Sequence, residues 1–256
     1  SNPAAIPEDP VSANDGFCMA FGLRDLGIDT ERHLTKYNPI PAATVSNTLE
    51  VQLTLPDIDM VNAIRASKGM TAISEPAGGW PIVIIGPGIG THKEHMLLMT
   101  GTLSLFGLAT VTIDHPLHGS RGYGAIETMS NPSVYMNMAS LPTVRDNLRQ
   151  SVTDLLGLRF GINFLSGANI DKSKVHFLGQ SLGAISGVDF LSIANTPIPG
   201  AADAVNDMFK VRASTLSVPT QGLANTLFES ETAGALLQSN VALAASEDYK
   251  TGVVAA

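Results

Sequence analysis

The sequence is poor in cysteine, in positive charge and in long apolar runs. Cys18 is the only cysteine among the 256 residues, so no internal disulfide can form. Lysine and arginine total 15 against 23 aspartates and glutamates, which gives a net charge of −8. No basic run is present that could track phosphates, and we expect no nucleic-acid partner. The apolar runs all stop short of the roughly 18 residues that a membrane-spanning helix needs.

The composition is that of a folded chain with a sizeable core. Hydrophobic residues make up 44% of the sequence and charged residues only 15%, which is not typical of disordered proteins. Residues 1–45 are rich in proline, asparagine and aspartate and show little periodicity, so we expect an irregular N-terminal arm. We interpret residues 46–256 as one domain.

Several short segments have the pattern of β-strands. Residues 48–55 alternate between apolar and polar side chains, which predicts a half-buried strand. "MTAI" at 70–73 suggests a short second strand. "PIVII" at 81–85 and "LATVTID" at 108–114 are continuous apolar runs, as expected of strands covered on both faces of a parallel sheet.

Helical patterns alternate with these strands. Thr91 and Glu94 have the spacing of a capping box, so we expect a helix to begin at Thr91 and to end at Gly107. A second amphipathic pattern begins at about Thr143.

The C-terminal half continues the alternation. "KVHFLG" predicts a strand, "LGAISGVDFLSIA" a helix and "VRASTLSVP" at 211–219 a further strand, while residues 223–245 have a helical composition. Strands that alternate with helices predict an α/β fold with a mostly parallel sheet and helices on both faces.

The segment "GQSLG" places Ser181 between two apolar segments, at the carboxyl end of a predicted strand. Gly179 and Gly183 leave room for a sharp strand-to-helix turn, which would expose the serine hydroxyl near the N-terminus of the next helix. This is the pattern of the nucleophile elbow of the α/β-hydrolase fold. Ser181 is therefore the candidate nucleophile, and a structural turn serine is the alternative.

Acyl transfer also requires an oxyanion hole, which is built from N–H groups. One donor is expected to be the backbone N–H of Leu182, directly after the nucleophile. Because this role is through the backbone, we expect Leu182→Ala to change the rate of hydrolysis little. The second is expected from the loop "GPGIG" after residues 81–85, where Ile89 is the candidate. A tight helix-entry turn without a catalytic role is the alternative for this loop.

Four blocks carry a more specific resemblance, namely "GGWPIVIIGPGIGTHKE", "TIDHPLHGSRG", "RDNLRQSVTDLLGLR" and "VHFLGQSLGAISG". In this order they resemble the N-terminal part of bacterial extracellular lipases of the Pla-1/cef family, over residues 45–240. The resemblance implies an α/β-hydrolase that acts on lipid esters, with Ser181 as the acyl-accepting nucleophile. It also implies a bacterial protein that is secreted or on the cell surface, and a substrate that can lie at a membrane surface.

By the same resemblance, the loop from Asp114 to Gly122 forms one wall of the substrate site. Asp114 could order this loop through backbone N–H groups, and His115 and His118 are expected to hydrogen-bond within it. One departure is Pro87, because the residue before the oxyanion glycine is often histidine in such hydrolases. We expect no cofactor and no metal, since the histidines lack the H-E-x-x-H spacing of zinc peptidases.

The expected base and acid are missing. The triad order in this fold is serine, then acid, then histidine, yet none of the six histidines follows Ser181. We therefore expect the fold to be truncated before its last strands, and this chain alone to be nearly inactive. His118 would be the most plausible base otherwise. The strand at 211–219 should then be a sheet edge, covered by the C-terminal segment or by a second copy in a dimer.

The sequence leaves three functions open. The favoured one is a serine carboxylic-ester hydrolase of the lipase or lysophospholipase type. The second is another α/β-hydrolase, such as a platelet-activating-factor acetylhydrolase-like enzyme or a peptidase, since fold does not fix substrate. The third is an inactive hydrolase-like module that binds through an apolar groove.

Overall fold

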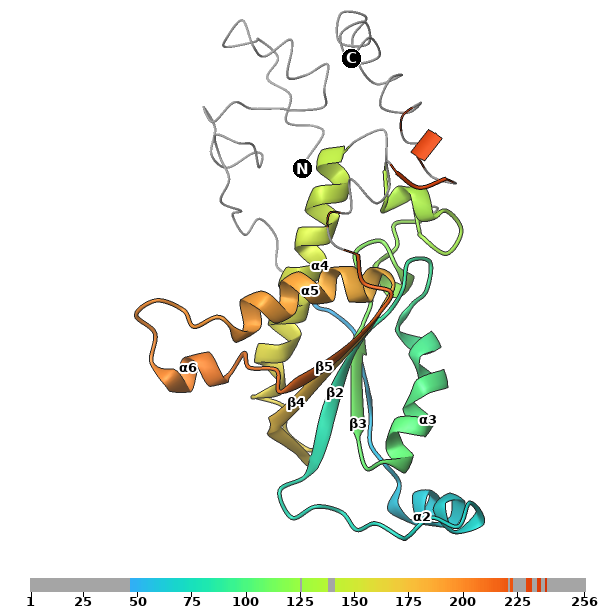
Figure 1. Ribbon diagram of the computed structural model, residues 1–256, viewed down its shortest axis with the longest axis vertical. Helices are drawn as coiled ribbons and strands as arrows, with labels where there is room; N and C mark the ends of the chain where they lie inside the picture. Colours follow the sequence, from blue (N-terminus) through green and yellow to red (C-terminus); the bar gives the residue numbers. More distant parts are fainter. Residues whose placement is uncertain are drawn as a thin grey trace, which may run out of the picture. The chain divides into compact units, whose positions relative to one another are not determined.

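The structure is a computed structural model that describes residues 47–124, 126–137 and 141–220, with isolated positions between 222 and 238. The chain divides into two compact units, and the one that carries the sheet comprises Leu49–Val134 and Leu148–Gln221. Figure 1 shows its strands flanked by helices. The expected N-terminal arm lies outside the described residues, and so does almost all of the helix predicted at 223–245.

In the described part of the chain, the sheet has five strands in the spatial order β1-β3-β2-β4-β5. The strands are β1 Val51–Thr54, β2 Trp80–Gly86, β3 Ala109–Ile113, β4 Ile170–Gln180 and β5 Ala213–Ser217. Only β1 is antiparallel to its neighbour. The predicted α/β fold with a mostly parallel sheet is thus confirmed. The carboxyl ends of β2, β3 and β4 meet at one edge, where ligands bind in such sheets.

One predicted strand is wrong and one helix was missed. Residues 70–73 form no strand, because their backbone groups bond to side chains of the preceding helix. The Asn62 amide pairs with the Ile73 N–H and carbonyl, and the Arg65 guanidinium donates to the Thr71 carbonyl. The preceding segment is instead the helix α2, Ile58–Ser67. Its N-cap is Asp57, whose carboxylate accepts hydrogen bonds from the N–H groups of Asp59 and Met60.

The helix after β2 begins later than predicted. A 3-10 helix η2, Lys93–Met96, leads into α3, Leu97–Leu105. The Thr91 hydroxyl and N–H both donate to the Gly88 carbonyl, at 2.7 and 3.3 Å. Thr91 therefore closes a turn instead of capping the helix. Gly107, at φ +73°, ends α3 as predicted.

The long helix α4, Leu141–Ile162, and the helix α5, Leu182–Asn195, follow the predicted order. The short α6, Asp203–Asp207, was not predicted. Among the described residues, no helix is long and apolar enough to cross a membrane.

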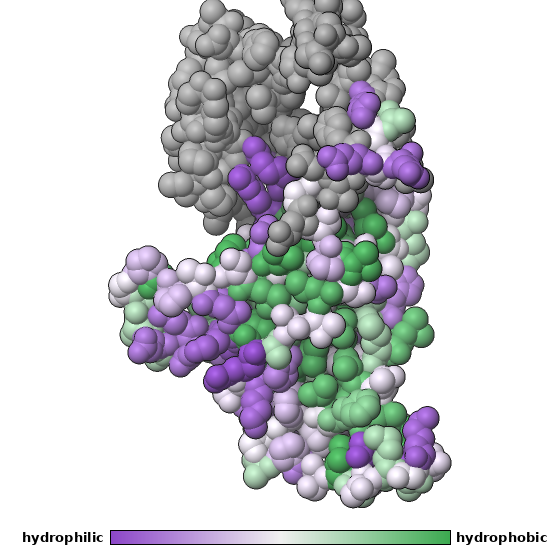
Figure 2. Space-filling view, viewed as in Figure 1, coloured by the Kyte–Doolittle hydropathy of each residue, from purple (hydrophilic) through white to green (hydrophobic). Residues whose placement is uncertain are grey.

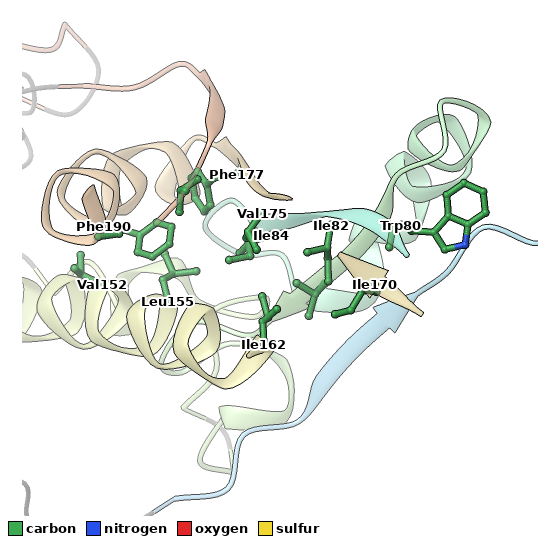
Figure 3. Packing of buried hydrophobic residues seen from close by; sticks show 14 residues of the cluster. Trp80, Ile82, Ile84, Val152, Leu155, Ile162, Ile170, Val175, Phe177 and Phe190 are labelled. Carbon is green, nitrogen blue, oxygen red and sulfur yellow. The ribbon is translucent and has the colours of Figure 1, made fainter. Parts of the chain in front are cut away.

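The larger core lies between the sheet and helices α4 and α5 (Figure 3). Ile84 of β2 and Phe177 of β4 point into it and are almost fully buried. Leu155 of α4 and Phe190 of α5 close it from the helix side, and the Phe177 and Phe190 rings are 5.2 Å apart. Each fully buried side chain of this size contributes about 1.5–3 kcal/mol, so this face fixes β4 and the turn that follows it.

The opposite face is covered less completely. Val83 and Ile85 of β2 pack with Met96 and α3 in a smaller cluster, against which Leu178 of β4 is only partly buried. Further along β4 on this face, Gln180 is exposed. In Figure 2, apolar surface accordingly extends over the region between α5 and α3, and hydrophilic surface lies around α6.

Strand β5 is an edge of the described sheet, as predicted. It pairs with β4 on one side, and all its residues except the partly buried Leu216 are exposed. Among the described residues, no strand pairs with the other side of β5, and the C-terminal segment that we expected to cover this edge lies almost entirely outside them. A dimer through the edge stays a prediction.

Candidate active site

Ser181 lies at the turn between β4 and α5 in a strained backbone conformation. Its φ is 50° and its ψ is −116°, which is a region that residues other than glycine rarely adopt. Such an outlier costs about 1–3 kcal/mol and persists only where the surroundings impose it. The Ser181 N–H donates to the Ser217 carbonyl of β5 at 3.0 Å. The side chain is half-buried and caps no N–H group of α5.

Glycine backbone contacts impose this turn. Gly86 of β2 is paired with Gly179 of β4 at the ends of their strands. A Cβ added at Gly183 would overlap the Gly86 carbonyl group, and one added at Gly179 would lie 2.6 Å from the Gly183 carbonyl oxygen. The first turn of α5 therefore passes over the strand ends at a distance that only glycine permits.

The loop of residues 86–90, which we call the glycine loop, lies against the serine. A Cβ at Gly88 would be in ordinary contact, 3.6 Å, with the Cβ of Ser181. The backbone N–H groups of Leu182 and Ile89 donate no hydrogen bond to another described residue. The first belongs to the positive N-terminal end of α5. Both predicted oxyanion donors are thus available on segments that meet at Ser181.

Two buried histidines hold the glycine loop from the neighbouring segment. The Nε2 of His118 accepts the Gly90 N–H at 3.3 Å, and its Nδ1 lies 2.8 Å from the Pro116 carbonyl oxygen. The Nε2 of His115 lies 3.2 Å from the Pro87 carbonyl oxygen. Burial, and secondly the proximity of His118, lowers the His115 pKa to about 3; burial also lowers the His118 pKa. Both rings are therefore neutral near pH 7.

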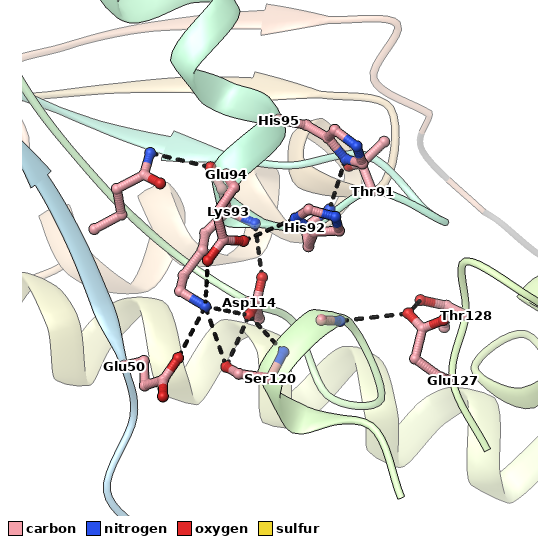
Figure 4. A network of polar contacts seen from close by, with 12 residues as sticks. Glu50, Thr91, His92, Lys93, Glu94, His95, Asp114, Ser120, Glu127 and Thr128 are labelled. Atoms are coloured by element: carbon pink, nitrogen blue, oxygen red, sulfur yellow. Dashed lines mark hydrogen bonds and ion pairs between the residues drawn. The ribbon is translucent and has the colours of Figure 1, made fainter. Parts of the chain in front are cut away.

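Asp114, at the end of β3, is the centre of a polar network (Figure 4). It is almost fully buried. Its Oδ1 accepts the Lys93 backbone N–H at 2.7 Å, and its Oδ2 lies 2.9 Å from the Lys93 Nζ. The Ser120 N–H and hydroxyl donate to the same Oδ2, at 3.0 and 2.9 Å. One carboxylate thereby connects the segment after the glycine loop to the segment that carries the histidines.

The charges in this network stabilise one another. Burial works to raise the Asp114 pKa, but the hydrogen bonds from Lys93 and Ser120 outweigh it and hold the pKa below its usual range. Burial likewise works to lower the Lys93 pKa, yet hydrogen bonds to Glu94, Asp114 and Glu50 raise it. Lys93 is therefore a charged structural group and not a base. This buried lysine was not predicted, since no local pattern pairs it with a carboxylate 21 residues away.

The rest of the loop after β3 is fixed by two more charged residues. The Arg121 guanidinium donates to the Asp114 carbonyl at 2.9 Å and to the Asp154 carboxylate of α4 at 2.6 Å. The Glu127 carboxylate accepts N–H groups from Met129 and Ser130. These bonds make the predicted substrate-side wall an ordered segment.

No hydrogen bond joins the Ser181 hydroxyl to a histidine among the described residues. Both ring nitrogens of His118 already have partners within the two loops, so its assignment as the alternative base is not supported. His92 and His95 stack on each other at 3.9 Å at the start of η2. His176, in β4, is half-buried. Among the described residues, no three histidine, cysteine, aspartate or glutamate side chains are grouped to hold a metal ion.

A separate apolar cavity of about 610 Å³ lies between β1, β3 and the second half of α4. It has the size of a small-molecule site. Ser181 and the glycine loop do not contribute to it. Its lining residues are Leu49, Val51, Leu53, Val111, Ile113, Thr153, Asp154, Gly157, Leu158, Gly161, Ile162 and Leu165.

The architecture is that of an α/β-hydrolase. A mostly parallel sheet carries helices on both faces, and a strained serine lies on a sharp strand-to-helix turn at the top of the sheet. The loop after β2 approaches that serine at Gly88, and this is the loop from which the fold is expected to supply its second oxyanion donor. The fold class predicted from the sequence is confirmed.

Solved structures of esterases and lipases have similar folds at low identity. A putative carboxylesterase from Lactobacillus plantarum is 17% identical over 80% of this chain and 71% of its own, with a TM-score of 0.43. A lipase/esterase from the same organism is 16% identical over 77% and 65%, with a TM-score of 0.41. An esterase from Thermogutta terrifontis is 14% identical over 75% and 56%, with a TM-score of 0.38.

The chain spans less than two thirds of the length of two of these three proteins. No family model matches the sequence, and no curated protein matches it either.

Proposed function

We propose that the protein is a serine carboxylic-ester hydrolase of the lipase or lysophospholipase type, with Ser181 as its nucleophile. The observation that carries the proposal is the strained Ser181 backbone, which is held by glycine contacts beside two available N–H donors. A turn serine with no chemical role would not require this strain. The resemblance to Pla-1/cef lipases supports a lipid ester as the substrate class and a secreted or surface-located protein.

In the proposed reaction, the Ser181 Oγ attacks the ester carbonyl carbon while a general base removes the hydroxyl proton. The carbonyl oxygen becomes an oxyanion that accepts hydrogen bonds from the Leu182 and Ile89 N–H groups. The C–O bond to the alcohol then breaks, and the alcohol leaves with the proton. Water attacks the acyl-enzyme in the same way and releases the carboxylic acid.

We place the base and its acid outside residues 1–256. The triad order of this fold requires a histidine after the serine, and the six histidines all precede Ser181. The two that contact or adjoin the glycine loop hold backbone groups instead. We therefore expect residues 1–256 alone to hydrolyse esters slowly or not at all.

The test compares ester hydrolysis by the product of the complete reading frame with that of residues 1–256. We expect the complete product to hydrolyse p-nitrophenyl butyrate and lysophospholipid. The Ser181→Ala variant should lose at least about 10³-fold in kcat/KM. Ser192→Ala, an exposed serine on the same helix α5, is the matched control and should keep its activity.

Three results would contradict the proposal. Ordinary turnover by residues 1–256 would place the base within this chain. Hydrolysis of peptides but not of esters would favour a peptidase. No hydrolysis of either class, with apolar ligands still bound, would favour the inactive binding module.

A further inference from the structure

The glycine loop is closed on one side by the turn from Gly88 to Thr91, and Gly90 within it is supported from outside the loop. It contains glycine at positions 86, 88 and 90, and Gly90 has a φ of +71°, so its backbone has few steric restraints of its own. Its second donor, the Ile89 N–H, is useful only if it stays aimed at the reacting oxygen. A displacement of about 1 Å can cost on the order of 10²-fold in rate.

The support is the imidazole of His118. The Gly90 N–H can only donate, so the Nε2 that it meets at 3.3 Å must carry a lone pair. The proton of the neutral ring then lies on Nδ1, which donates it to the Pro116 carbonyl at 2.8 Å. A single tautomer satisfies both partners. The ring is fully buried, so water does not compete for these bonds.

We propose that His118 is a positioning residue for the oxyanion hole, and that its unprotonated Nε2 holds the Gly90 N–H and thereby aims the Ile89 N–H. This rests on the proposed function, in which the Ile89 N–H binds the oxyanion. His115 supports the same loop from the Pro87 carbonyl. These histidines were expected to hydrogen-bond within the substrate-site loop. His118 does so at Pro116, and the contacts of both rings with the glycine loop add the more specific role.

The same contact makes the loop sensitive to acid. Protonation would convert Nε2 into a donor, and two N–H groups would then face each other. Among the described residues, the Pro116 carbonyl, Asp114 and Glu127 favour the charged ring, whereas burial and Arg121 oppose it. The centroid of the neutral His115 ring lies 5.7 Å from that of the His118 ring. Burial is the strongest of these influences, so the loop stays held at neutral pH and is released only below the usual histidine range.

The first test does not depend on catalysis. In residues 1–256, long-range ¹H–¹⁵N correlation spectra at pH 7.5 should show His118 protonated on Nδ1 and not on Nε2. On titration from pH 8 to pH 4, the Gly90 amide shift should follow His118 protonation. In His118→Gln, whose amide oxygen reaches the position of Nε2, the Gly90 amide should lose that titration.

The second test measures reactivity in the product of the complete reading frame. At pH 8, His118→Phe keeps a ring but lacks the acceptor, and should slow fluorophosphonate labelling of Ser181 by about 10- to 100-fold. His118→Gln should restore the rate to within a few-fold of the unmodified protein. His95→Gln changes a histidine that accepts an N–H from its own turn, and it is the matched control.

The outcomes separate the two proposals. The inference would be overturned if His118 carried its proton on Nε2, or if the Gly90 amide shift did not follow His118 protonation. Either result would overturn it whether or not Ser181 is labelled. Equal labelling rates in His118→Phe and His118→Gln would overturn it as well. If Ser181 does not label in any variant while the spectra agree with the expected tautomer, the proposed function fails, and the support of the loop by His118 stands.

Discussion

The two sides of the candidate site are fixed by different means. On the serine side, Gly86, Gly179 and Gly183 bring backbone against backbone, and no side chain is needed. On the loop side, buried polar side chains hold the backbone through hydrogen bonds, and the main ones are those of Asp114 and His118. Substitutions that add volume should therefore destabilise the serine side most. The loop side should be destabilised by substitutions that remove a charge and by a change of pH.

The largest effect is expected on the serine side, from Gly183→Ala. The new methyl group would overlap the Gly86 carbonyl. Because neither backbone can move away, the cost exceeds that of ordinary overpacking in a core. We expect the free energy of unfolding to fall by about 4 kcal/mol, or the protein not to fold. Urea denaturation followed by circular dichroism measures this loss. The control is Gly101→Ala in α3, where a Cβ meets open space and should stabilise by about 0.5–1 kcal/mol. A loss below about 1 kcal/mol for Gly183→Ala would show that the crossing is not tight.

On the loop side, we expect Asp114→Asn to lower the free energy of unfolding by about 3 kcal/mol at pH 7, because it removes the charge that partners the buried Lys93. The loss should also depend on pH. The folded-state Asp114 pKa is lowered, so its stabilisation is present above the unfolded-state pKa of about 3.9 and is lost as pH falls through the lower folded value.

The unmodified protein should therefore lose stability more steeply than Asp114→Asn as the pH falls from about 5 towards 2. Asp203→Asn, at an exposed position, is the control and should change the profile little. If the free energy of unfolding of the unmodified protein and of Asp114→Asn fell in parallel with pH, the protonation of Asp114 would not be coupled to folding.

A third change separates side chain from backbone at the oxyanion hole. The side chain of Leu182 is almost fully buried, so it contributes to stability, although the reaction is expected to use only its backbone N–H. We expect Leu182→Ala to cost about 2–3 kcal/mol of stability and to leave the labelling rate of the folded molecules unchanged, since the N–H remains. A specific loss of labelling without loss of stability would contradict the assignment.

The smallest effect concerns the strain at Ser181. Glycine adopts a positive φ without an energetic cost, whereas alanine at this position still bears the cost that serine bears. After the entropy that glycine adds to the unfolded chain is subtracted, Ser181→Gly should be about 1 kcal/mol more stable than Ser181→Ala. Matched urea denaturation of the two variants gives the difference. Equal stabilities would mean that the turn is not strained.

The same contrast explains what could be predicted from sequence. The serine side is local: the apolar strand, the two glycines and the apolar helix lie within about 20 consecutive residues, and they predicted β4, the elbow and α5. Strands β2 and β3 were found for the same reason. Helix α2 was missed, although Asp57 with the acidic Asp59 in the first turn is a usable N-terminal signal.

The loop side could not be predicted in this way. Asp114 and Lys93 are 21 residues apart in sequence, and His118 and Gly90 are 28 apart. Each pair meets only because β2 and β3 are parallel neighbours with their carboxyl ends at the same edge. Sequence placed His118 in the right loop, but the tautomer and the partner that define its role follow from the tertiary arrangement.

The central claim is that Ser181 is an activated nucleophile, and covalent labelling tests it most directly. The product of the complete reading frame is treated with a fluorophosphonate, digested, and its modified residue is located by mass spectrometry. The account predicts one phosphonylated residue, Ser181, and no labelling in Ser181→Ala. Labelling of another serine, or equal labelling in Ser181→Ala, would contradict it.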